Sequence, residues 1–100
     1  MESMLRMAIT VRFIGAFRNF SRKTRFTIQT EKTITLRELI NKTAKAMPRL
    51  EKALIDSELE DPRPNALIIV NGKEISILNG LKTKIKDGDE VVFIPVLHGG

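Results

Sequence analysis

The sequence of 100 residues contains no cysteine, no tryptophan and no tyrosine, and it has a single histidine. The absence of cysteine excludes disulfides, thiolate metal sites, iron–sulfur ligation and a cysteine nucleophile. The one histidine, His98, is the third residue from the end of the sequence, where chains are usually mobile. Serine or metal-water chemistry that depends on a positioned histidine is therefore not expected, and hydrolase activity is disfavoured.

Long hydrophobic runs are also absent. The longest, residues 91–97, contains Pro95 and is far shorter than the roughly 20 residues of a membrane-spanning helix. Glu2, Arg6 and Arg12 interrupt the apolar stretch near the N-terminus, so no secretory signal is predicted. We expect a soluble, cytoplasmic protein without membrane contact.

Charge is distributed unevenly along the chain. Residues 1–50 hold 11 basic and 3 acidic side chains and residues 51–100 hold 6 and 9, so the halves carry +8 and −3 within a net charge of +5. A basic surface attracts nucleic acids and acidic proteins by the same Coulombic steering. Charge alone leaves both kinds of partner open.

Apolar periodicity predicts the elements of the fold, because alternation is typical of half-buried strands and spacings of three and four are typical of helices. Strands are predicted over residues 7–14, 25–30, 67–70, 73–77 and 90–96, a main helix over residues 36–47, and a short helical turn within residues 49–59. Thr35 and Glu38 form a capping-box signature at the start of the main helix. The basic segment 18–23 is predicted to be a polar connection between two hairpin strands, and Asn71-Gly72 a tight turn.

The order of these elements predicts the fold class. One main helix must cover one face of a mixed sheet of four to five strands, which is an α+β, ubiquitin-like β-grasp architecture. Residues 1–96 are expected to form a single domain, and residues 97–100 a flexible, exposed tail that ends in Gly-Gly.

Gly99 and Gly100 suggest chemistry at the terminus. A carboxylate carried by two residues without Cβ atoms can thread a narrow channel and reach ATP. Adenylation would convert that carboxylate into an acyl donor, open to attack by a sulfur or amine nucleophile. A frayed end is the alternative, but the predicted fold and the lack of other chemistry favour a reactive terminus.

Five segments, in this order and spacing, resemble the MoaD/ThiS-like sulfur-carrier family, and most closely the small subunit of molybdopterin synthase. They are Val11-Arg12-Phe13-Ile14-Gly15-Ala16-Phe17-Arg18, Leu36-Arg37-Glu38-Leu39, Val70-Asn71-Gly72, Asp87-Gly88-Asp89-Glu90-Val91 with Pro95, and Gly99-Gly100. The resemblance covers nearly the whole chain. The wider family includes the thiamine sulfur carrier, the ubiquitin-related modifier and the small archaeal ubiquitin-like modifiers.

The resemblance implies a sulfur carrier that is a substrate of enzymes and not an enzyme itself. A ubiquitin-activating-type enzyme would adenylate Gly100 with ATP, and a persulfide donor would replace AMP to leave a thiocarboxylate for molybdopterin (molybdenum cofactor) biosynthesis. Gly99 would give access, and Leu97 and His98 would be recognised in the channel of the activating enzyme. The large subunit of molybdopterin synthase is a further expected partner. The chain lacks a phosphate-binding glycine loop, so we expect it to bind no cofactor of its own.

Two alternatives remain open. The tail Leu97-His98-Gly99-Gly100 is more similar to the ubiquitin-related modifier, whose roles are tRNA thiolation and attachment to lysines. The chain would then be a ubiquitin-like modifier joined through Gly100 to lysines of target proteins. The other alternative is a plain β-grasp binding module with an incidental tail.

Partner docking is expected on an apolar patch of the sheet, opposite the helix, with Val91 and Phe93 as candidate docking residues. Lys82, Lys84 and Lys86 are interpreted as a solvated edge that discourages aggregation, or as a surface that faces the activating enzyme.

Two further patterns have simpler interpretations. Arg18, Arg22, Lys23 and Arg25 alternate with Phe17, Phe20 and Phe26, which superficially resembles a nucleic-acid surface. A solvated hairpin tip with Phe17 and Phe26 in the core is favoured, so direct nucleic-acid binding is not expected. The acidic run of Glu58, Glu60 and Asp61 lacks the alternation and glycine of a calcium loop, so no metal site is expected.

Overall fold

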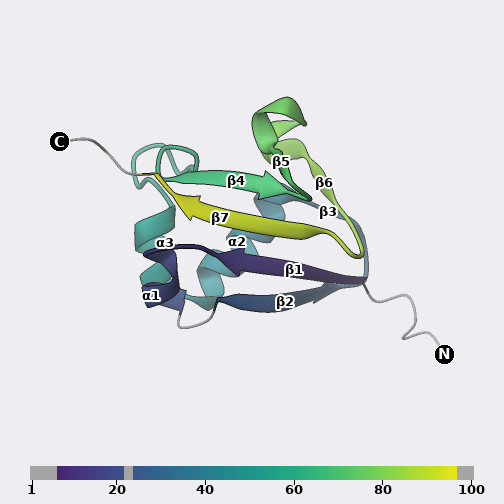
Figure 1. Ribbon diagram of the computed structural model, residues 1–100, viewed down its shortest axis with the longest axis horizontal. Coiled ribbons are helices and arrows are strands. Elements are labelled where there is room, and N and C mark those ends of the chain that lie inside the picture. The colour runs from purple at the N-terminus through teal and green to yellow at the C-terminus, as the bar shows by residue number, and fades with distance from the viewer. Residues whose placement is uncertain (1–6, 22–23, 97–100) are drawn as a thin grey trace.

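The computed structural model describes residues 7–21 and 24–96. They form a five-stranded mixed sheet in the order β2-β1-β7-β4-β5, with helices packed on one face (Figure 1). The strands are β1 (Met7–Phe13), β2 (Arg25–Thr30), β4 (Ala66–Val70), β5 (Lys73–Glu74) and β7 (Glu90–Pro95). The last strand, β7, lies at the centre of the sheet, parallel to β1 and antiparallel to β4. The predicted β-grasp fold is confirmed.

The main helix, α2 (Leu36–Ala46), begins at the predicted capping box. The Glu38 backbone N–H donates to the Thr35 hydroxyl at 3.1 Å, and the Thr35 backbone N–H donates to the Glu38 carboxylate at 2.8 Å. The backbone hydrogen bond from Thr35, followed by its hydroxyl contact, holds the pKa of Glu38 below its ordinary value. The buried side chains of α2 are those of Leu36, Leu39, Ile40, Thr43 and Ala44.

Two shorter helices extend this layer, with α1 packed against α3 and α3 against α2. The expected helical turn is confirmed as α3 (Pro48–Leu54), which starts with a proline whose fixed φ suits the first helical turn. A polar connection is predicted for residues 18–23, but residues 18–21 belong to a second helix, α1 (Phe17–Ser21), so the prediction is wrong for this part, and residues 22–23 lie outside the described residues. Phe17 is 3% exposed, and its burial draws this basic segment back onto the core. A single buried phenylalanine gives no helical period, so the pattern missed the helix.

Short elements complete the fold between β4 and β7. The predicted strand 73–77 is shorter than expected, because β5 ends at Glu74 and a 3-10 helix follows it. The remaining elements are the 3-10 helices η2 (Ile75–Ile77) and η3 (Gly80–Lys82), and the paired strands β3 (Ile34–Thr35) and β6 (Lys84–Ile85). Strands of two residues are too short to alternate, so the sequence pattern did not reveal them.

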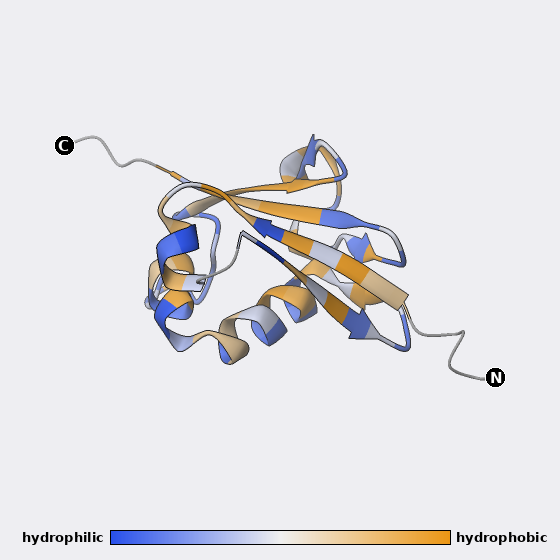
Figure 2. Cartoon of the chain, turned by 60° about the horizontal axis from the view of Figure 1, so that its bottom comes forward, coloured by the Kyte–Doolittle hydropathy of each residue, from blue (hydrophilic) through white to orange (hydrophobic). Residues whose placement is uncertain are grey.

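The hydrophobic core lies between the sheet and the helices. The Phe13 and Phe93 rings stack there with centroids 5.8 Å apart. In Figure 2 the hydrophobic residues follow the central strands, and the helices alternate between hydrophobic and hydrophilic residues. No helix in the described part of the chain is long and apolar enough to cross a membrane.

Candidate functional site

The end of β7 is where the chain leaves the sheet toward the predicted tail. Pro95 lies opposite Ala66 of β4 in the register of the two strands. The Val96 backbone N–H donates to the Asn65 carbonyl oxygen at 3.0 Å, one residue beyond the strand. The pairing with β4 therefore holds the chain up to its last described residue.

The turn after β1 closes the other side of this exit. The Ile14 backbone N–H donates to the Phe93 carbonyl oxygen at 3.0 Å. Gly15 follows with a φ of +59°, and a Cβ at this position would lie 3.2 Å from Cγ of Pro95. Because L side chains rarely adopt this φ, glycine allows the turn to pack directly on the proline ring. Both neighbours of β7 thus fix the direction in which the chain leaves the domain.

We expect Gly15→Ala to destabilise the domain more than Gly80→Ala. The two glycines have nearly the same φ, +59° and +57°, so each substitution should cost about 1–2 kcal/mol in backbone strain. At Gly80 the new Cβ would meet the flexible guanidinium of Arg63 at 3.8 Å, whereas at Gly15 it would press on the ring of Pro95. Urea unfolding measures the difference. If both variants lost the same free energy of unfolding, the contact between Gly15 and Pro95 would contribute nothing to the stability of the exit.

The outer face of the sheet beside the exit carries four apolar side chains, which we call the sheet-face stripe: Leu67 and Ile69 of β4, and Val92 and Ile94 of β7. The strand register places Leu67 opposite Ile94 and Ile69 opposite Val92. Leu67 is 41% exposed and the other three are half-buried. An apolar patch therefore lies opposite the helices, on the side of the sheet where the sequence predicts one.

The two residues that we predicted for this patch, Val91 and Phe93, do not lie on it. Both are 0% exposed, and they face the helices. Alternation along β7 turns Val92 and Ile94 outward instead. The prediction of Val91 and Phe93 as docking residues is wrong, because a partner cannot reach them. A run of four apolar residues does not reveal which face each one takes, whereas the pairing with Leu67 and Ile69 does.

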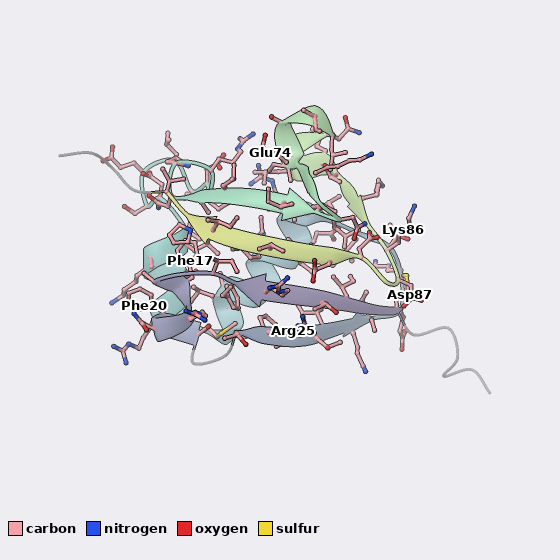
Figure 3. All side chains as sticks on the ribbon, in the orientation of Figure 1. Phe17, Phe20, Arg25, Glu74, Lys86 and Asp87 are labelled. Carbon is pink, nitrogen blue, oxygen red and sulfur yellow. The ribbon has the colours of Figure 1, made fainter. Side chains whose placement is uncertain are left out.

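Charged side chains border the stripe on its β1 and β2 side. Arg12 forms an ion pair with Glu90 at 3.5 Å, and both side chains are more than a third exposed. Arg25, labelled in Figure 3, lies opposite Arg12 in the register of β1 and β2 and is exposed. An exposed pair of this kind contributes at most about 1 kcal/mol, so the local charge remains available to a partner. A surface that covers the stripe will meet positive charge on this side.

The residues with predicted chemistry, Leu97, His98, Gly99 and Gly100, lie outside the described residues. The division into a domain of residues 1–96 and a tail of residues 97–100 also stays a prediction. Within residues 7–21 and 24–96, no group of three or more histidine, aspartate or glutamate side chains could hold a metal ion. The exit and the sheet-face stripe are thus the parts of the site that the structure places.

The phenylalanines of the basic segment lie in or against the core. Phe17 is buried, and Phe26 stacks on Phe13 with ring centroids 5.6 Å apart. Phe20 is half-buried and lies with Phe17 on α1 (Figure 3). A single-stranded nucleic acid needs exposed ring faces for stacking. The interpretation of Phe17 and Phe26 as core residues is confirmed, which weakens the case for a nucleic-acid surface here.

Comparison with known proteins first gives a family. The model of the Urm1 (ubiquitin related modifier) family matches residues 8–100. Ubiquitin-related modifier 1 of Schizosaccharomyces pombe is 40% identical over 38 residues, which are 38% of this chain and 39% of that protein. A protein of Archaeoglobus fulgidus with the provisional name of sulfur carrier protein is 42% identical over 52 residues, which are 51% of this chain and 56% of that protein. The chain thus spans about half the length of these relatives or less.

Solved structures share the fold over nearly the whole chain. Small archaeal modifier protein 1 of Methanosarcina acetivorans superposes with a TM-score of 0.80 at 21% identity, covering 95% of this chain and 98% of that one. Urm1 of Trypanosoma brucei gives a TM-score of 0.74 at 26% identity, covering 95% and 97%. A chain in a complex of subunits 1 and 2 of molybdopterin-converting factor from Helicobacter pylori gives a TM-score of 0.60 at 24% identity, covering 94% of this chain and 100% of that one. Proteins of this fold therefore include one solved together with its partner subunit.

Proposed function

Because this chain belongs to the Urm1 (ubiquitin related modifier) family of small ubiquitin-like carriers and modifiers, which are not catalytic enzymes, we propose that it is a sulfur carrier acting through Gly100. A ubiquitin-activating-type enzyme joins the Gly100 carboxylate to AMP from ATP and releases pyrophosphate. The sulfur of a persulfide then attacks the acyl-adenylate and AMP leaves. A second thiol attacks the donor's sulfur in the resulting acyl disulfide and forms a disulfide with it, so that the S–S bond to the terminus breaks and Gly100 leaves as a thiocarboxylate.

The position of β7 is the observation that supports this proposal most strongly. The strand is central in the sheet, is bonded on the β1 side as far as Phe93, and on the β4 side is held as far as Val96, four residues before Gly100. A rigid exit presents the tail in one direction, which reduces the conformational freedom lost when an enzyme channel takes it in. In the proposal, Leu97 and His98 are recognised in that channel and Gly99 allows close approach.

The sheet-face stripe is the docking surface in this proposal. It lies on β4 and β7, the two strands that pair at the exit, so a partner that covers it has the tail within reach. Its apolar side chains suit a protein partner, since burying them releases water from both surfaces. The expected partners are the activating enzyme and the large subunit of molybdopterin synthase, and no bound cofactor is required on this chain.

Molybdopterin biosynthesis is the destination that we propose for the sulfur, from the resemblance of the five sequence segments. A second candidate is favoured by the family match itself, because the family is named for modifiers. In that function Gly100 is transferred to a lysine amine of a target protein, or its sulfur is used to thiolate tRNA. Both functions begin with the same activated terminus, so one measurement separates them from a plain binding module.

The test is the intact mass of the protein isolated from its native host, taken before and after treatment with a thiol alkylator. Because the chain has no cysteine, alkylation and the replacement of one oxygen by sulfur would both report a thiocarboxylate. Larger species with a Gly-Gly remnant on lysines of other proteins would support the modifier. A chain that continues beyond Gly100, or whose terminus is blocked, would contradict the proposal.

We expect Leu67→Asp to weaken binding of the activating enzyme by at least about 100-fold, because the partner would bury a charge where the stripe is apolar. Leu67 is already 41% exposed, so the domain should still fold. Thr27→Asp is the matched control, since Thr27 is exposed on β2 on the same face of the sheet. Calorimetric titration of the purified enzyme gives both affinities. Equal affinity for Leu67→Asp and the unmodified chain would rule out docking through the stripe.

A further inference from the structure

Residues 73–86 form a lobe beyond the end of β4, which we call the lysine lobe. It consists of β5, η2, η3 and β6 (Figure 1). The lobe holds one acidic residue, Glu74, and four lysines: Lys73, Lys82, Lys84 and Lys86. Its net charge is therefore +3, within a half of the chain whose net charge is −3. Among the described residues, none of the four lysines forms an ion pair.

Three carboxylates close to these lysines already have other partners. Glu38, whose pKa is lowered by its hydrogen bonds with Thr35 and less strongly by the charge of Lys84, belongs to the capping box. Glu74 accepts hydrogen bonds from the backbone N–H and the hydroxyl of Ser76. Asp89 is 7% exposed and accepts from the Asn71 side chain at 2.8 Å and from the Lys86 backbone N–H at 2.8 Å. Figure 3 shows Glu74 and Lys86 on this side of the molecule, away from Phe17 on α1. The positive charge of the lobe is thus available to a partner.

An apolar side chain in the lobe indicates what kind of partner it fits. Ile77 of η2 is 71% exposed. The next residue, Leu78, lines a hollow of about 380 Å³ together with Lys73, Lys84 and Lys86. Phosphate and sugar contacts use charge and hydrogen bonds and would leave an isoleucine uncovered. A protein surface with acidic groups around an apolar side chain would satisfy both the lysines and Ile77.

This chain itself carries a surface of that chemistry. Residues 56–61, which we call the acidic loop, place Leu59, at 68% exposure, among four acidic residues: Asp56, Glu58, Glu60 and Asp61. The Asp56 carboxylate fixes the loop by accepting the backbone N–H groups of Glu58 and Leu59 at 3.0 and 2.9 Å. Arg63 pairs with Asp61 at 2.6 Å, which leaves three acidic side chains around Leu59 without an ion pair in the described part of the chain. Leu59 and Ile77 are the two most exposed large hydrophobic side chains of the described residues, and the charge around Leu59 is opposite to that of the lobe.

The acidic loop precedes the start of β4 at Ala66 and the lysine lobe follows its end at Val70, about 13 Å along the strand. Arg63, which pairs with Asp61, reaches toward the lobe and would lie 3.8 Å from a Cβ at Gly80. Leu59 and Ile77 nevertheless stay exposed in one chain, so neither covers the other. We propose that the lysine lobe binds the acidic loop of a second copy of this chain, with Leu59 of one copy against Ile77 of the other. The contact is heterologous and joins the lobe of one copy to the loop of the next, so successive copies form a closed ring or an open chain. It leaves the sheet-face stripe free and is independent of the proposed function.

Sedimentation of the full-length purified protein tests the proposal. Each copy has a net charge of +5, which opposes association, so the contact should be weak and sensitive to salt. At about 1 mM protein we expect the weight-average mass to exceed that of the monomer in about 0.05 M salt and to return to it in about 0.5 M salt. A monomer under both conditions would overturn the proposal.

Two double variants test whether the contact joins the lobe of one copy to the loop of another. The lobe variant, Ile77→Ser with Lys84→Glu, and the loop variant, Leu59→Ser with Glu58→Lys, change only exposed side chains. We expect each variant alone to be monomeric, because each lacks one half of the contact. An equal mixture should form a one-to-one pair and nothing larger, because one intact lobe and one intact loop remain. A mixture that stays monomeric would overturn the proposal.

Misfolding, a general effect of charge and association through a different surface are each tested by a control. Thermal unfolding checks that both double variants fold like the unmodified chain. Lys42→Glu makes the same charge change on the exposed side of α2 and should leave association unchanged. Loss of association in Leu67→Asp would assign the contact to the sheet-face stripe and overturn the proposal. Salt-sensitive binding of a short RNA to the lobe of a chain that stays monomeric without RNA would also overturn it, in favour of a polyanion site.

Discussion

We expect removal of Gly99 and Gly100 to abolish thiocarboxylate formation completely and to leave the unfolding temperature of the domain unchanged. The reaction requires a carboxylate that can enter the active site of an activating enzyme, and the shortened chain would end at His98, whose side chain blocks close approach. The described core is complete without these residues, because its last buried member is Phe93. Intact mass after incubation with the activating enzyme, ATP and a persulfide donor measures the effect.

A Gly100→Ala variant separates two causes of that loss. It keeps the terminal carboxylate at its normal distance from Val96 and adds a single Cβ. If close backbone approach matters, this variant should also lose most of its thiocarboxylate. If the length of the tail alone matters, it should react like the unmodified chain. Formation of an alkylatable terminus in the chain that lacks both glycines would contradict the proposed function.

The shortened chain also separates docking from chemistry. It keeps the sheet-face stripe and the exit intact, so it should still bind the activating enzyme and compete with the unmodified chain for it. Leu67→Asp should show the reverse, a normal terminus and weak binding. Loss of binding on removal of the glycines, as large as the loss from Leu67→Asp, would mean that the tail and not the stripe supplies the affinity.

Local sequence signals predicted the elements that have a local cause. Thr35 and Glu38 form the capping box that starts α2, at the position their spacing indicates. Asn71 and Gly72 have φ values of +49° and +84°, which is the conformation that this dipeptide favours, and they form the turn between β4 and β5. In both cases a hydrogen bond or a backbone preference within a few residues decides the structure.

The features that the sequence did not reveal depend on contacts between distant segments. α1 forms because Phe17 packs into the core, and the paired strands β3 and β6 bring residues 34–35 beside residues 84–85. Contacts between distant segments also decide which residues form the sheet-face stripe. Whether Val92 or Phe93 faces outward is set by the register of β7 against β1 and β4, and one apolar run contains no information on that register.

Because Phe93 lies in the core and not at the surface, its substitution should lower the stability of the domain rather than its binding to a partner. We expect Phe93→Ala to lower the free energy of unfolding by about 3–5 kcal/mol, because it empties a fully buried site. Phe93 is 0% exposed, stacks on Phe13 and lies opposite Ile68 in the pairing with β4. Urea unfolding gives the value. Since small domains have only about 5–15 kcal/mol of stability in total, Phe93→Leu, which keeps more of the volume, provides a measurable intermediate.

Val92→Ala is the matched control for this substitution. Val92 is adjacent in β7 and half-buried on the outer face, so its truncation should cost less than about 1 kcal/mol. If Phe93 were instead a docking residue at the surface, Phe93→Ala would leave the stability nearly unchanged and would weaken binding of the activating enzyme. The structure predicts the converse, that Phe93 sets stability and the stripe residue Val92 contributes to docking. Measuring unfolding and binding on the same two variants decides between these assignments.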